Sequence, residues 1–457
     1  MQHGASLAGL VLVTVNPAYL KEELRHVLAA SGAAGIFHSD GYRGTDMGEV
    51  VRQLRGELPQ LRESTAFSAW DAFLATSDST ILLPDVQPSD TAQIQFTSGT
   101  TGKPKGARLH HRGLVNASRF AAQRAEFPDG GVWATAMPLF HVGGCAGSQL
   151  GAMTSRGTFV LQTAFEPGGM LSIIESERVN HLHAVPAMVL RILEHPALPA
   201  RDGSSLRTLM SGGSQVPASL VERARRELGC RFTITFGQTE LCGVVSQTYP
   251  GDSLERQTST IGQPAPWMEV KVADPDSGMP RPLGETGEIW ARGYQVMHSY
   301  YNLASDMEPA ITADGWLRTG DLASMDSAGY LRVTGRLKDC IIRGGENIYP
   351  REIEDALLMH PAVHEVSVVG LSDPQWGEIV AAALRLRTGM TPPTTLELHH
   401  HCRSRLAAYK TPAAWFYVED FPTTASGKVQ KFALKEQMKS GALTPQPFKK
   451  PERLKAN

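Results

Sequence analysis

The sequence lacks most features that would tie the chain to a special environment. It has no run of 18 apolar residues and no N-terminal secretory pattern, which argues against a membrane-spanning helix and a signal peptide. It has only five cysteines and no CxxC pair, so a disulfide framework and a clustered zinc site are both disfavoured. These absences predict reduced thiols in a cytoplasmic protein.

Neither sign of charge dominates the chain. Lysine and arginine total 44 against 46 aspartates and glutamates, so the formal net charge is only -2. A nearly neutral protein has no overall field that would attract a nucleic acid or a membrane surface. Any anion that it binds must therefore be held by groups placed locally. The 457 residues suffice for about two to four domains with a large buried core.

The first half alternates apolar, strand-like runs with helical patterns. The run Leu10–Val15 precedes Asn16-Pro17, a good helix cap and first helical residue, and the helix that follows would end at Gly32. A second strand-like run follows at "AGIFHS", so this segment is typical of a βαβ unit. The alternation recurs between residues 158 and 237. We therefore expect an α/β fold whose parallel strands present ligands at their carboxyl edge.

The pattern of apolar and turn residues changes twice further along the chain. After Trp267, short alternating runs separated by turn residues predict a β-rich subdomain. From Lys338 the order strand, helix, strand, strand, helix, strand predicts a small α+β domain. We place the boundary there, giving a large domain over 1–337, built on parallel α/β sheets, and a small mobile C-terminal domain over 338–457.

The stretch "TSGTTGKPKG", from Thr97 to Gly106, directly follows the strand-like run "AQIQF". Glycines allow the backbone to approach a phosphate closely, and hydroxyls and lysines share its negative charge. The order does not fit GxxxxGK[ST], because Gly99 and Gly102 are too close and Pro104 follows Lys103. A mobile polar hairpin is the alternative interpretation, but this order of residues is very improbable by chance.

Together with six further motifs, this stretch resembles the adenylate-forming superfamily of acyl-CoA synthetases, adenylation domains and luciferases. The others, in the family's order, are "PLFHVGG", "SGGSQVP", "TFGQTE", "GWLRTGDLA", "GRLKDCIIRGGENIYPREIE" and "TASGKVQK". They extend from Thr97 to Lys431, and such an ordered set is highly specific. Within the superfamily, the chain is most similar to synthetases of fatty, especially medium-chain, acids.

The resemblance implies a ligase that works in two half-reactions. A carboxylate attacks the α-phosphate of MgATP to give acyl-AMP and pyrophosphate, and the thiol of coenzyme A then displaces AMP. Both steps bring anions together, so the site must supply positive charge and orientation. ATP, Mg²⁺, coenzyme A and an apolar or fatty carboxylic acid are the expected ligands.

The resemblance also assigns residues to the triphosphate and the metal. The expected phosphate contacts are Thr97, Ser98, Gly99, Thr100, Thr101, Gly102, Lys103 and Lys105. Glu240 is the expected Mg²⁺ ligand, since a carboxylate beside phosphates suits that ion. Thr239 would hydrogen-bond the α-phosphate or the acyl carboxylate. Taken alone, Glu240 would be an ordinary surface carboxylate, and the ordered motifs favour the functional interpretation.

The nucleoside part has its own expected contacts. Phe236 stands where the family usually has a tyrosine stacked on adenine, and it keeps the stacking face without the hydroxyl. Close backbone approach to the base is expected at Gly212, Gly213, Ser214 and Gly237. Asp321 resembles the family's ribose ligand, and Arg336 would reach the ribose or the phosphates. A turn is the alternative role for the glycines and for Asp321.

The C-terminal motifs supply the expected moving parts. Lys428 would bridge the carboxylate and the α-phosphate as a cation during adenylation. Lys338 matches the hinge about which the small domain swings. Gly344 and Gly345 would line the pantetheine tunnel, and Trp376 would contact the coenzyme A nucleotide. A partly buried core tryptophan is an equally good interpretation of Trp376.

The acid is expected to lie between the helix that starts at Pro186 and the segments 141–147 and 237–244. His141 is a candidate gate between the half-reactions, with a structural histidine as the alternative. The small and apolar residues of "HVGGCAG" and "LCGVV" suit an aliphatic chain without setting its length. An aromatic acid would also fit.

The resemblance begins inside the family's large domain, which is expected to start roughly 70 to 90 residues earlier. We expect its outer strands and helices to be missing, which would uncover sheet edges and apolar surface. Two other functions stay open. An adenylating ligase would pass the acyl group to a carrier-protein thiol or an amine, and a non-catalytic relic would only bind nucleotide. The sequence does not determine the oligomeric state, for which a homodimer is one candidate.

Overall fold

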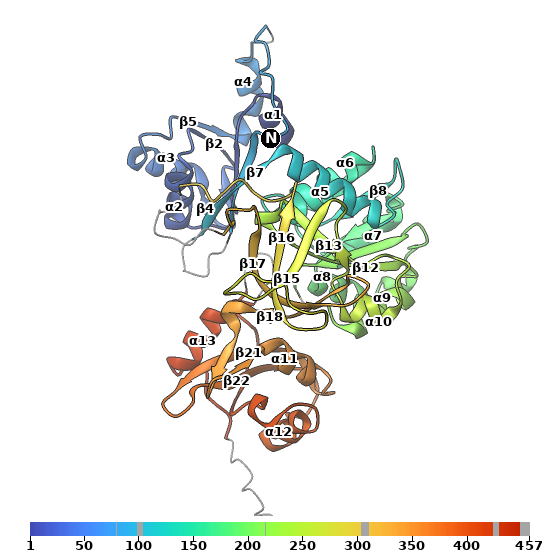
Figure 1. Cartoon of the computed structure of the whole chain (residues 1–457). Helices are drawn as coiled ribbons and strands as arrows, with labels where there is room; N and C mark the ends of the chain where they lie inside the picture. Colours follow the sequence, from blue (N-terminus) through green and yellow to red (C-terminus); the bar gives the residue numbers. More distant parts are fainter. Residues whose placement is uncertain (79, 98–103, 215, 303–309, 424–428, 448–457) are drawn as a thin grey trace, which may run out of the picture. The chain divides into compact units, whose positions relative to one another are not determined.

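A computed structural model of the chain describes residues 1–78, 80–97, 104–214, 216–302, 310–423 and 429–447 (Figure 1). The chain divides into two compact units. The first comprises Met1–Lys271 and Trp290–Thr319, and the second comprises Val272–Ile289 and Gly320–Asn457. The expected division into domains over 1–337 and 338–457 stays a prediction.

A seven-stranded sheet forms the centre of the first unit, in the order β14-β13-β12-β11-β10-β8-β9. Its strands are β8 (Val132–Thr135), β9 (Thr158–Leu161), β10 (His181–His183), β11 (Thr208–Gly212), β12 (Arg231–Gln238), β13 (Gly243–Gln247) and β14 (Gln263–Pro264). Strands β8 to β12 are parallel, and β13 and β14 run antiparallel to their neighbours. The expected parallel α/β sheet is confirmed.

Helices cover both faces of this sheet because neighbouring strand residues point in opposite directions. The helical segments are α5 (His111–Arg124), η2 (Gly143–Leu150), α6 (Gly151–Thr154), α7 (Pro167–Ser176), α8 (Pro186–Leu193), η3 (Leu198–Ala200), α9 (Ala218–Glu227) and α10 (Leu254–Ser259). Leu209 packs in a buried cluster with residues of α7, α8 and α9. The next residue, Met210, packs with Ala122 of α5 and Ala152 of α6. Each such buried side chain contributes about 1.5–3 kcal/mol.

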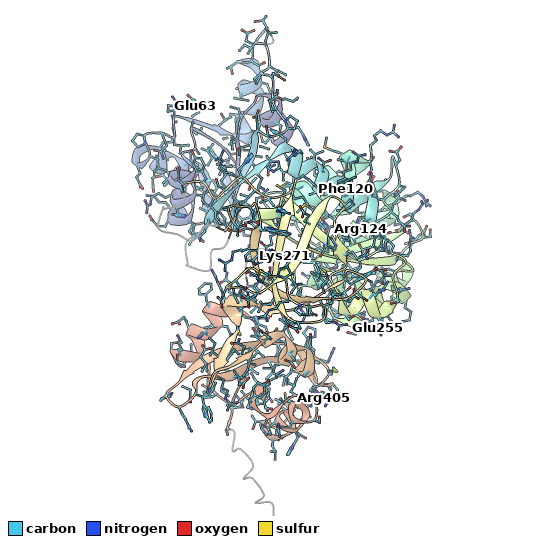
Figure 2. All side chains as sticks on the ribbon, viewed as in Figure 1. Glu63, Phe120, Arg124, Glu255, Lys271 and Arg405 are labelled. Carbon is cyan, nitrogen blue, oxygen red and sulfur yellow. The ribbon has the colours of Figure 1, made fainter. Side chains whose placement is uncertain are left out.

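Arg124, at the end of α5, ties that helix to the antiparallel edge of the sheet (Figure 2). Its Nη1 donates to the carbonyls of Gln263 at 2.6 Å and Gln247 at 3.3 Å, and its Nη2 donates to Pro264 at 2.8 Å. The guanidinium also lies 4.7 Å from the ring centroid of Tyr249. A planar cation with several donors suits this bridge better than an ammonium would.

The N-terminal part of the first unit differs from the βαβ expectation. Its elements are α1 (Gln2–Leu7), β1 (Leu12–Thr14), α2 (Lys21–Ser31), β2 (Gly35–His38), β3 (Gly41–Tyr42), β4 (Thr45–Asp46), α3 (Met47–Glu57), β5 (Glu63–Ala66), η1 (Phe67–Ala69), α4 (Trp70–Ala75), β6 (Thr91–Thr97) and β7 (Lys105–His110). Strand β1 pairs with β6 and strand β2 with β5, in separate sheets. The sequence order shows that strands exist, but long-range packing selects their partners, and here the βαβ prediction was wrong.

Helix α2 also begins later than expected. Asn16 caps no helix, because its side chain accepts from the Ala18 amide at 3.0 Å within a turn. The helix begins at Lys21, where Glu23 accepts a hydrogen bond from the Leu20 amide at 2.9 Å. The reach of Glu23 back to the first turn therefore decides the start. The end is as expected, with Gly32 at φ 63° in the left-handed conformation.

The second unit holds a five-stranded sheet with the order β20-β19-β22-β21, and β23 pairs with β22. Three strands have residues in both units: β15 (Met268–Ala273), β16 (Gly287–Gly293) and β17 (Leu317–Met325). The other elements of the second unit are β18 (Leu331–Arg336), η5 (Leu337–Asp339), β19 (Ile341–Arg343), β20 (Glu346–Ile348), α11 (Pro350–Leu358), β21 (Val363–Asp373), β22 (Gly377–Leu386), α12 (Thr395–Arg403), η6 (Ala408–Lys410), β23 (Ala414–Tyr417) and α13 (Lys431–Lys439). Val368 packs with α11 and α12, while Val369 packs with α13. The expected α+β character is confirmed.

Two further findings concern the chain as a whole. Among the helices of the described residues, none has the length and apolarity that crossing a membrane would require. All five cysteines belong to the described part, and each is a free thiol. Burial raises the pKa of Cys145 to about 11, so this thiol is protonated and poorly nucleophilic at neutral pH.

Two buried histidines predict that the fold loses stability in acid. Burial lowers the pKa of His181 well below its usual range, and burial together with the nearby charge of His141 lowers that of His183 to about 4. The His181 ring lies 4.0 Å from that of Trp133, and neither of its nitrogens has a hydrogen-bond partner within the described residues. Both histidines are therefore neutral in the folded chain.

Acidification should lower the free energy of unfolding below pH about 6.5, because the unfolded histidines bind protons that the folded ones exclude. The expected loss is about 1.4 kcal/mol per pH unit for each histidine, until His183 itself protonates near pH 4. Urea unfolding at pH 7, 6 and 5 measures this loss. A His181→Asn variant should show a smaller slope, and an unchanged slope would contradict the explanation.

Candidate active site

The expected phosphate loop joins strands β6 and β7 of the first unit. These strands form an antiparallel hairpin in which Thr97 pairs with Lys105, so the loop is closed at its base. Six of its expected contacts, Ser98, Gly99, Thr100, Thr101, Gly102 and Lys103, lie outside the described residues. His26 of α2 contacts the end of the loop next to β7, where its Nε2 lies 3.1 Å from the Pro104 carbonyl oxygen.

Glu240 lies beside the base of this loop. It belongs to η4 (Thr239–Leu241), the short turn after β12, and is half-buried. Its Oε1 accepts hydrogen bonds from the Tyr300 hydroxyl at 2.7 Å and from Thr97 Oγ1 at 3.3 Å. Burial, followed by the charge and hydrogen bond of Glu240, raises the pKa of Tyr300. The phenol is therefore protonated at neutral pH and donates to the carboxylate.

The donor set fits a magnesium ion that ATP brings with it. Glu240 is a hard oxygen ligand, and no cation among the described residues pairs with it. Mg²⁺ is typically bound by one or two carboxylates together with substrate phosphates and water. Within the described part, no group of three or more acidic, histidine or cysteine side chains is arranged to hold a metal by itself.

The adenine contacts expected from the sequence meet at the carboxyl ends of β11 and β12, which are neighbours in the sheet. Gly213 and Ser214 are exposed just beyond β11, and Phe236 and Gly237 lie at a bulge in β12. A Cβ at Gly212 would lie 2.2 Å from the Thr235 carbonyl oxygen, so close strand packing already requires glycine there. Thr239, the residue directly after β12, is buried.

The candidate gate, His141, lies directly before a helical segment. His141 precedes η2, a π-helical turn of small residues, and its Nδ1 accepts from the Gly143 amide at 3.1 Å. Such π-turns are frequent at functional sites. His183, at the carboxyl end of β10, bonds Ser148 of η2 at 2.8 Å. Val142 and Cys145 pack in one buried cluster with Leu241 and Cys242, so two of the three expected acid-binding segments, 141–147 and 237–244, are neighbours within the first unit.

Asp321 and Arg336 are brought together in the second unit. They are opposite each other in the antiparallel pair β17–β18, and Arg336 Nε donates to Asp321 Oδ1 at 2.8 Å. Asp321 is buried, with 4% of its surface exposed, whereas most of the Arg336 side chain is exposed. Glu288 supports the adjacent turn, because its Oε1 accepts from the Gly320 amide at 2.8 Å.

Gly344 and Gly345 form the two-residue turn of the hairpin β19–β20. Their φ angles of 59° and 87° suit glycine, which such hairpin turns prefer. Gly344 also contacts Trp376, whose carbonyl accepts from the Gly344 amide at 2.8 Å. Trp376 is 45% exposed, so it is no core residue. Lys338 is exposed in η5, between β18 and β19.

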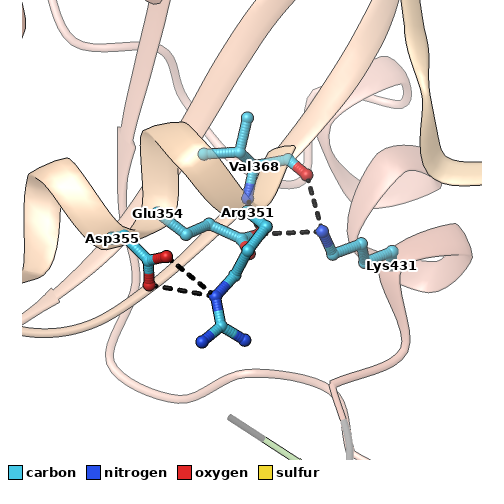
Figure 3. Close-up of polar contacts among 5 residues, drawn as sticks. All are labelled: Arg351, Glu354, Asp355, Val368 and Lys431. Carbon is cyan, nitrogen blue, oxygen red and sulfur yellow. Dashed lines mark hydrogen bonds and ion pairs between the residues drawn. The ribbon is translucent and has the colours of Figure 1, made fainter. Parts of the chain in front are cut away.

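Lys428 lies outside the described residues, but the helix that follows it is anchored firmly (Figure 3). Lys431, the first residue of α13, donates to Glu354 of α11 at 2.7 Å and to the Val368 carbonyl at 3.1 Å. The same carboxylate oxygen accepts from the Val368 amide at 2.9 Å. One turn later, Lys435 pairs with Glu378 of β22 at 3.1 Å.

Sequence reasoning missed Tyr300, Glu288, His183 and Lys431. Tyr300 lies within the stretch "MHSYY", which carries no chemical signature, and its partner Glu240 lies 60 positions earlier. A buried acid such as Glu288 is equally hidden in a strand sequence. Only Lys431 had a local signal, since it ends the quoted motif "TASGKVQK".

Comparison with known proteins identifies similar chains over nearly the whole length. The family model described as AMP-binding enzyme matches residues 1–301, and the model described as AMP-binding enzyme C-terminal domain matches residues 352–428. YngI of Bacillus subtilis (strain 168), provisionally named an acyl-CoA synthetase, is 37% identical to this chain. The match covers 96% of this chain and 84% of YngI. The mouse mitochondrial medium-chain acyl-CoA ligase ACSF2 is 34% identical, with 96% of this chain and 76% of the relative covered.

Solved structures agree with the sequence relatives. The crystal structure of ATP-bound MatB from Rhodopseudomonas palustris superposes with a TM-score of 0.87 at 26% sequence identity. The match covers 96% of this chain and 86% of that one.

Proposed function

The chain belongs to the AMP-binding enzyme family and is an AMP-forming acyl-CoA synthetase, and from this premise we propose that its acid is a medium-chain fatty acid or a similar apolar carboxylic acid. Its substrates are the acid, ATP and coenzyme A. The acid is first activated as acyl-AMP with release of pyrophosphate, and the acyl group then passes to coenzyme A. The named specificity of the mouse relative supports the chain length, and the small, largely apolar residues of η2 support an aliphatic acid.

The observation that carries the proposed site is the hydrogen bond from Thr97, at the base of the phosphate loop, to Glu240. Bound beside the triphosphate, Mg²⁺ would neutralise part of its charge, and Glu240 would hold it. Thr97 and Lys105 would orient the phosphates from the hairpin base, with residues 98–103 supplying the remaining expected contacts. Thr239 would hydrogen-bond the reacting α-phosphate or the acid. Preorganised groups of this kind lower the barrier because they need no rearrangement during reaction.

The nucleoside and the thiol would use the remaining candidates. Phe236 would stack on adenine beside the Gly212–Ser214 turn, and Asp321 would accept from the ribose hydroxyls next to Arg336. We also propose Lys338 as the hinge, since it is exposed in a short turn between two strands. Gly344, Gly345 and Trp376 form one surface feature that would suit coenzyme A.

Two finer assignments concern the location of the protein and its assembly. A cytoplasmic location is proposed because all five thiols are free. A homodimer is proposed only as the oligomeric state to test first, by analytical ultracentrifugation.

An acid panel in an ATP–pyrophosphate exchange assay tests the function. We expect exchange to rise with apolar acids of medium chain length and to be weak with acetate, since each buried methylene adds about 0.8 kcal/mol of binding. Product analysis should show acyl-CoA only when coenzyme A is present. Acyl-AMP that turns over without coenzyme A would indicate a carrier-protein thiol or an amine as acceptor. Nucleotide binding without any exchange would indicate a non-catalytic protein.

A further inference from the structure

Tyr300 makes a contact that the reaction described above leaves unexplained. Its hydroxyl donates to Glu240 Oε1 at 2.7 Å, and Thr97 donates to the same oxygen at 3.3 Å. Within the described part of the chain, no hydrogen bond reaches the second oxygen, Oε2. The two donors therefore hold the carboxylate by one oxygen and leave the other available.

The backbone around Tyr300 is tied to the strand that leaves the phosphate loop. Tyr300 forms a bridge with Ala107 of β7, and the Tyr301 amide donates to the Gly106 carbonyl at 2.7 Å. The Met297 amide donates to the carbonyl of Glu240 itself at 2.9 Å. The segment 297–301 thus connects the loop base to the backbone that carries the carboxylate.

The ring of Tyr300 adds a second link to the loop. Lys105, an expected phosphate contact, has its Nζ 5.4 Å from the ring centroid. A cation above an aromatic face is attracted to it by about 0.5–1 kcal/mol at a partly exposed position. The hydroxyl thus orients an anion and the ring orients a cation, and both groups face the same part of the loop base.

We propose that Tyr300 is a positioning residue that holds Glu240 Oε1 and so presents Oε2 to the magnesium ion of MgATP. The inference deepens the proposed function and rests on it. In this role Tyr300 would contact neither the metal nor the nucleotide. Its effect is on the orientation of Glu240, so it should act on the metal-bound form of ATP and not on ATP alone.

A Tyr300→Phe variant tests this inference because it removes the hydroxyl and keeps the ring beneath Lys105. Isothermal titration calorimetry compares the binding of ATP with saturating Mg²⁺ to its binding in EDTA. We expect affinity for MgATP to fall roughly 10-fold, as for a lost hydrogen bond to a charged group, and affinity for metal-free ATP to stay unchanged. The neighbouring Tyr301→Phe is the matched control, since the contact of Tyr301 with β7 uses only its backbone, and it should bind both forms as the wild type does.

A double-mutant cycle separates orientation from general damage to the fold. In a Glu240→Gln background, Tyr300→Phe should change MgATP affinity less than about 2-fold, because its target carboxylate is gone. Equal weakening with and without Mg²⁺, an unchanged MgATP affinity, or the same loss in both backgrounds would overturn the proposal. If Tyr300→Phe did not fold, a Glu240→Gln variant with the full Mg²⁺ preference of the wild type would overturn it equally.

The outcome is separable from that of the proposed function. A wild-type chain that adenylates an acid while Tyr300→Phe binds MgATP normally would refute only the positioning role. A wild-type chain that binds MgATP but shows no pyrophosphate exchange with any acid of the panel would refute the function, whatever the result for Tyr300→Phe.

Discussion

Lys428→Ala is expected to reduce acid-dependent ATP–pyrophosphate exchange on the order of 100- to 1000-fold, while preformed acyl-AMP is still converted to acyl-CoA at the wild-type rate. The acid's carboxylate and the α-phosphate are both anions, and their repulsion is greatest as they approach. An ammonium between them offsets that repulsion only in the first half-reaction. The second half-reaction begins from a neutral acyl group joined to AMP, so it does not need this cation.

The assay of the two half-reactions must exclude simple damage to the second unit. Lys439→Ala is a suitable control, because Lys439 ends α13, the helix that follows Lys428, and among the described residues its ion pair is with the exposed Glu436, one turn away. It should leave both half-reactions unchanged. If Lys428→Ala slowed both equally, the proposed swing of the C-terminal domain about Lys338 would lose its support.

Because other residues anchor α13, Lys428→Ala should not change the stability of the second unit. Lys431 and Lys435 hold the helix through ion pairs with Glu354 and Glu378, and the Lys428→Ala substitution keeps all four of these residues. Thermal unfolding of Lys428→Ala should therefore match the wild type. Lys431 differs, since its loss would leave Glu354, which is only 9% exposed, without its cation.

Asp321→Asn is the second large effect that we expect, raising the KM for ATP on the order of 100-fold. A carboxylate accepts two strong hydrogen bonds from the ribose hydroxyls, whereas an amide keeps one acceptor and presents a donor. The pairing with Arg336 is lost as well. The KM for the acid should change little, because the acid does not touch the ribose.

Steady-state exchange kinetics with varied ATP measure this effect. Asp326→Asn is the matched control, since Asp326 lies in the turn between β17 and β18 and accepts from the amides of Ala328 and Tyr330. Asparagine keeps that acceptor oxygen, so the turn should persist. A similar KM for ATP in Asp321→Asn and in the control would rule out the ribose contact.

The alternation of strands and helices predicted the central parallel sheet better than it predicted which N-terminal strands pair. The carboxyl edge of β11 and β12 was expected from alternating strands and helices, and it carries Gly213 and Phe236 as anticipated. The sequence did not predict that β1 pairs with β6 or that β2 pairs with β5. Local propensity gives the existence of a strand, but the energy of pairing depends on apolar faces far away in the chain.

Helix ends show the same limit on a smaller scale. Gly32 was correctly placed because a left-handed cap is a property of one residue. The start of α2 was misplaced by four residues, from Pro17 to Lys21, because two local caps competed. Asn16 closes a turn of its own, and Glu23 caps the helix instead.

By itself the sequence determined the chemistry, because motifs such as "TSGTTGKPKG" and "TASGKVQK" bring hydroxyls, glycines and lysines together within a few residues, where the chain's own geometry keeps them close. Tertiary structure alone decided how Glu240 is oriented, since Thr97 and Tyr300 reach it from 143 and 60 positions away. Such distant partners meet only when sheet pairing and core burial bring their backbones into register. Those forces are summed over many residues, so no short stretch of sequence encodes them.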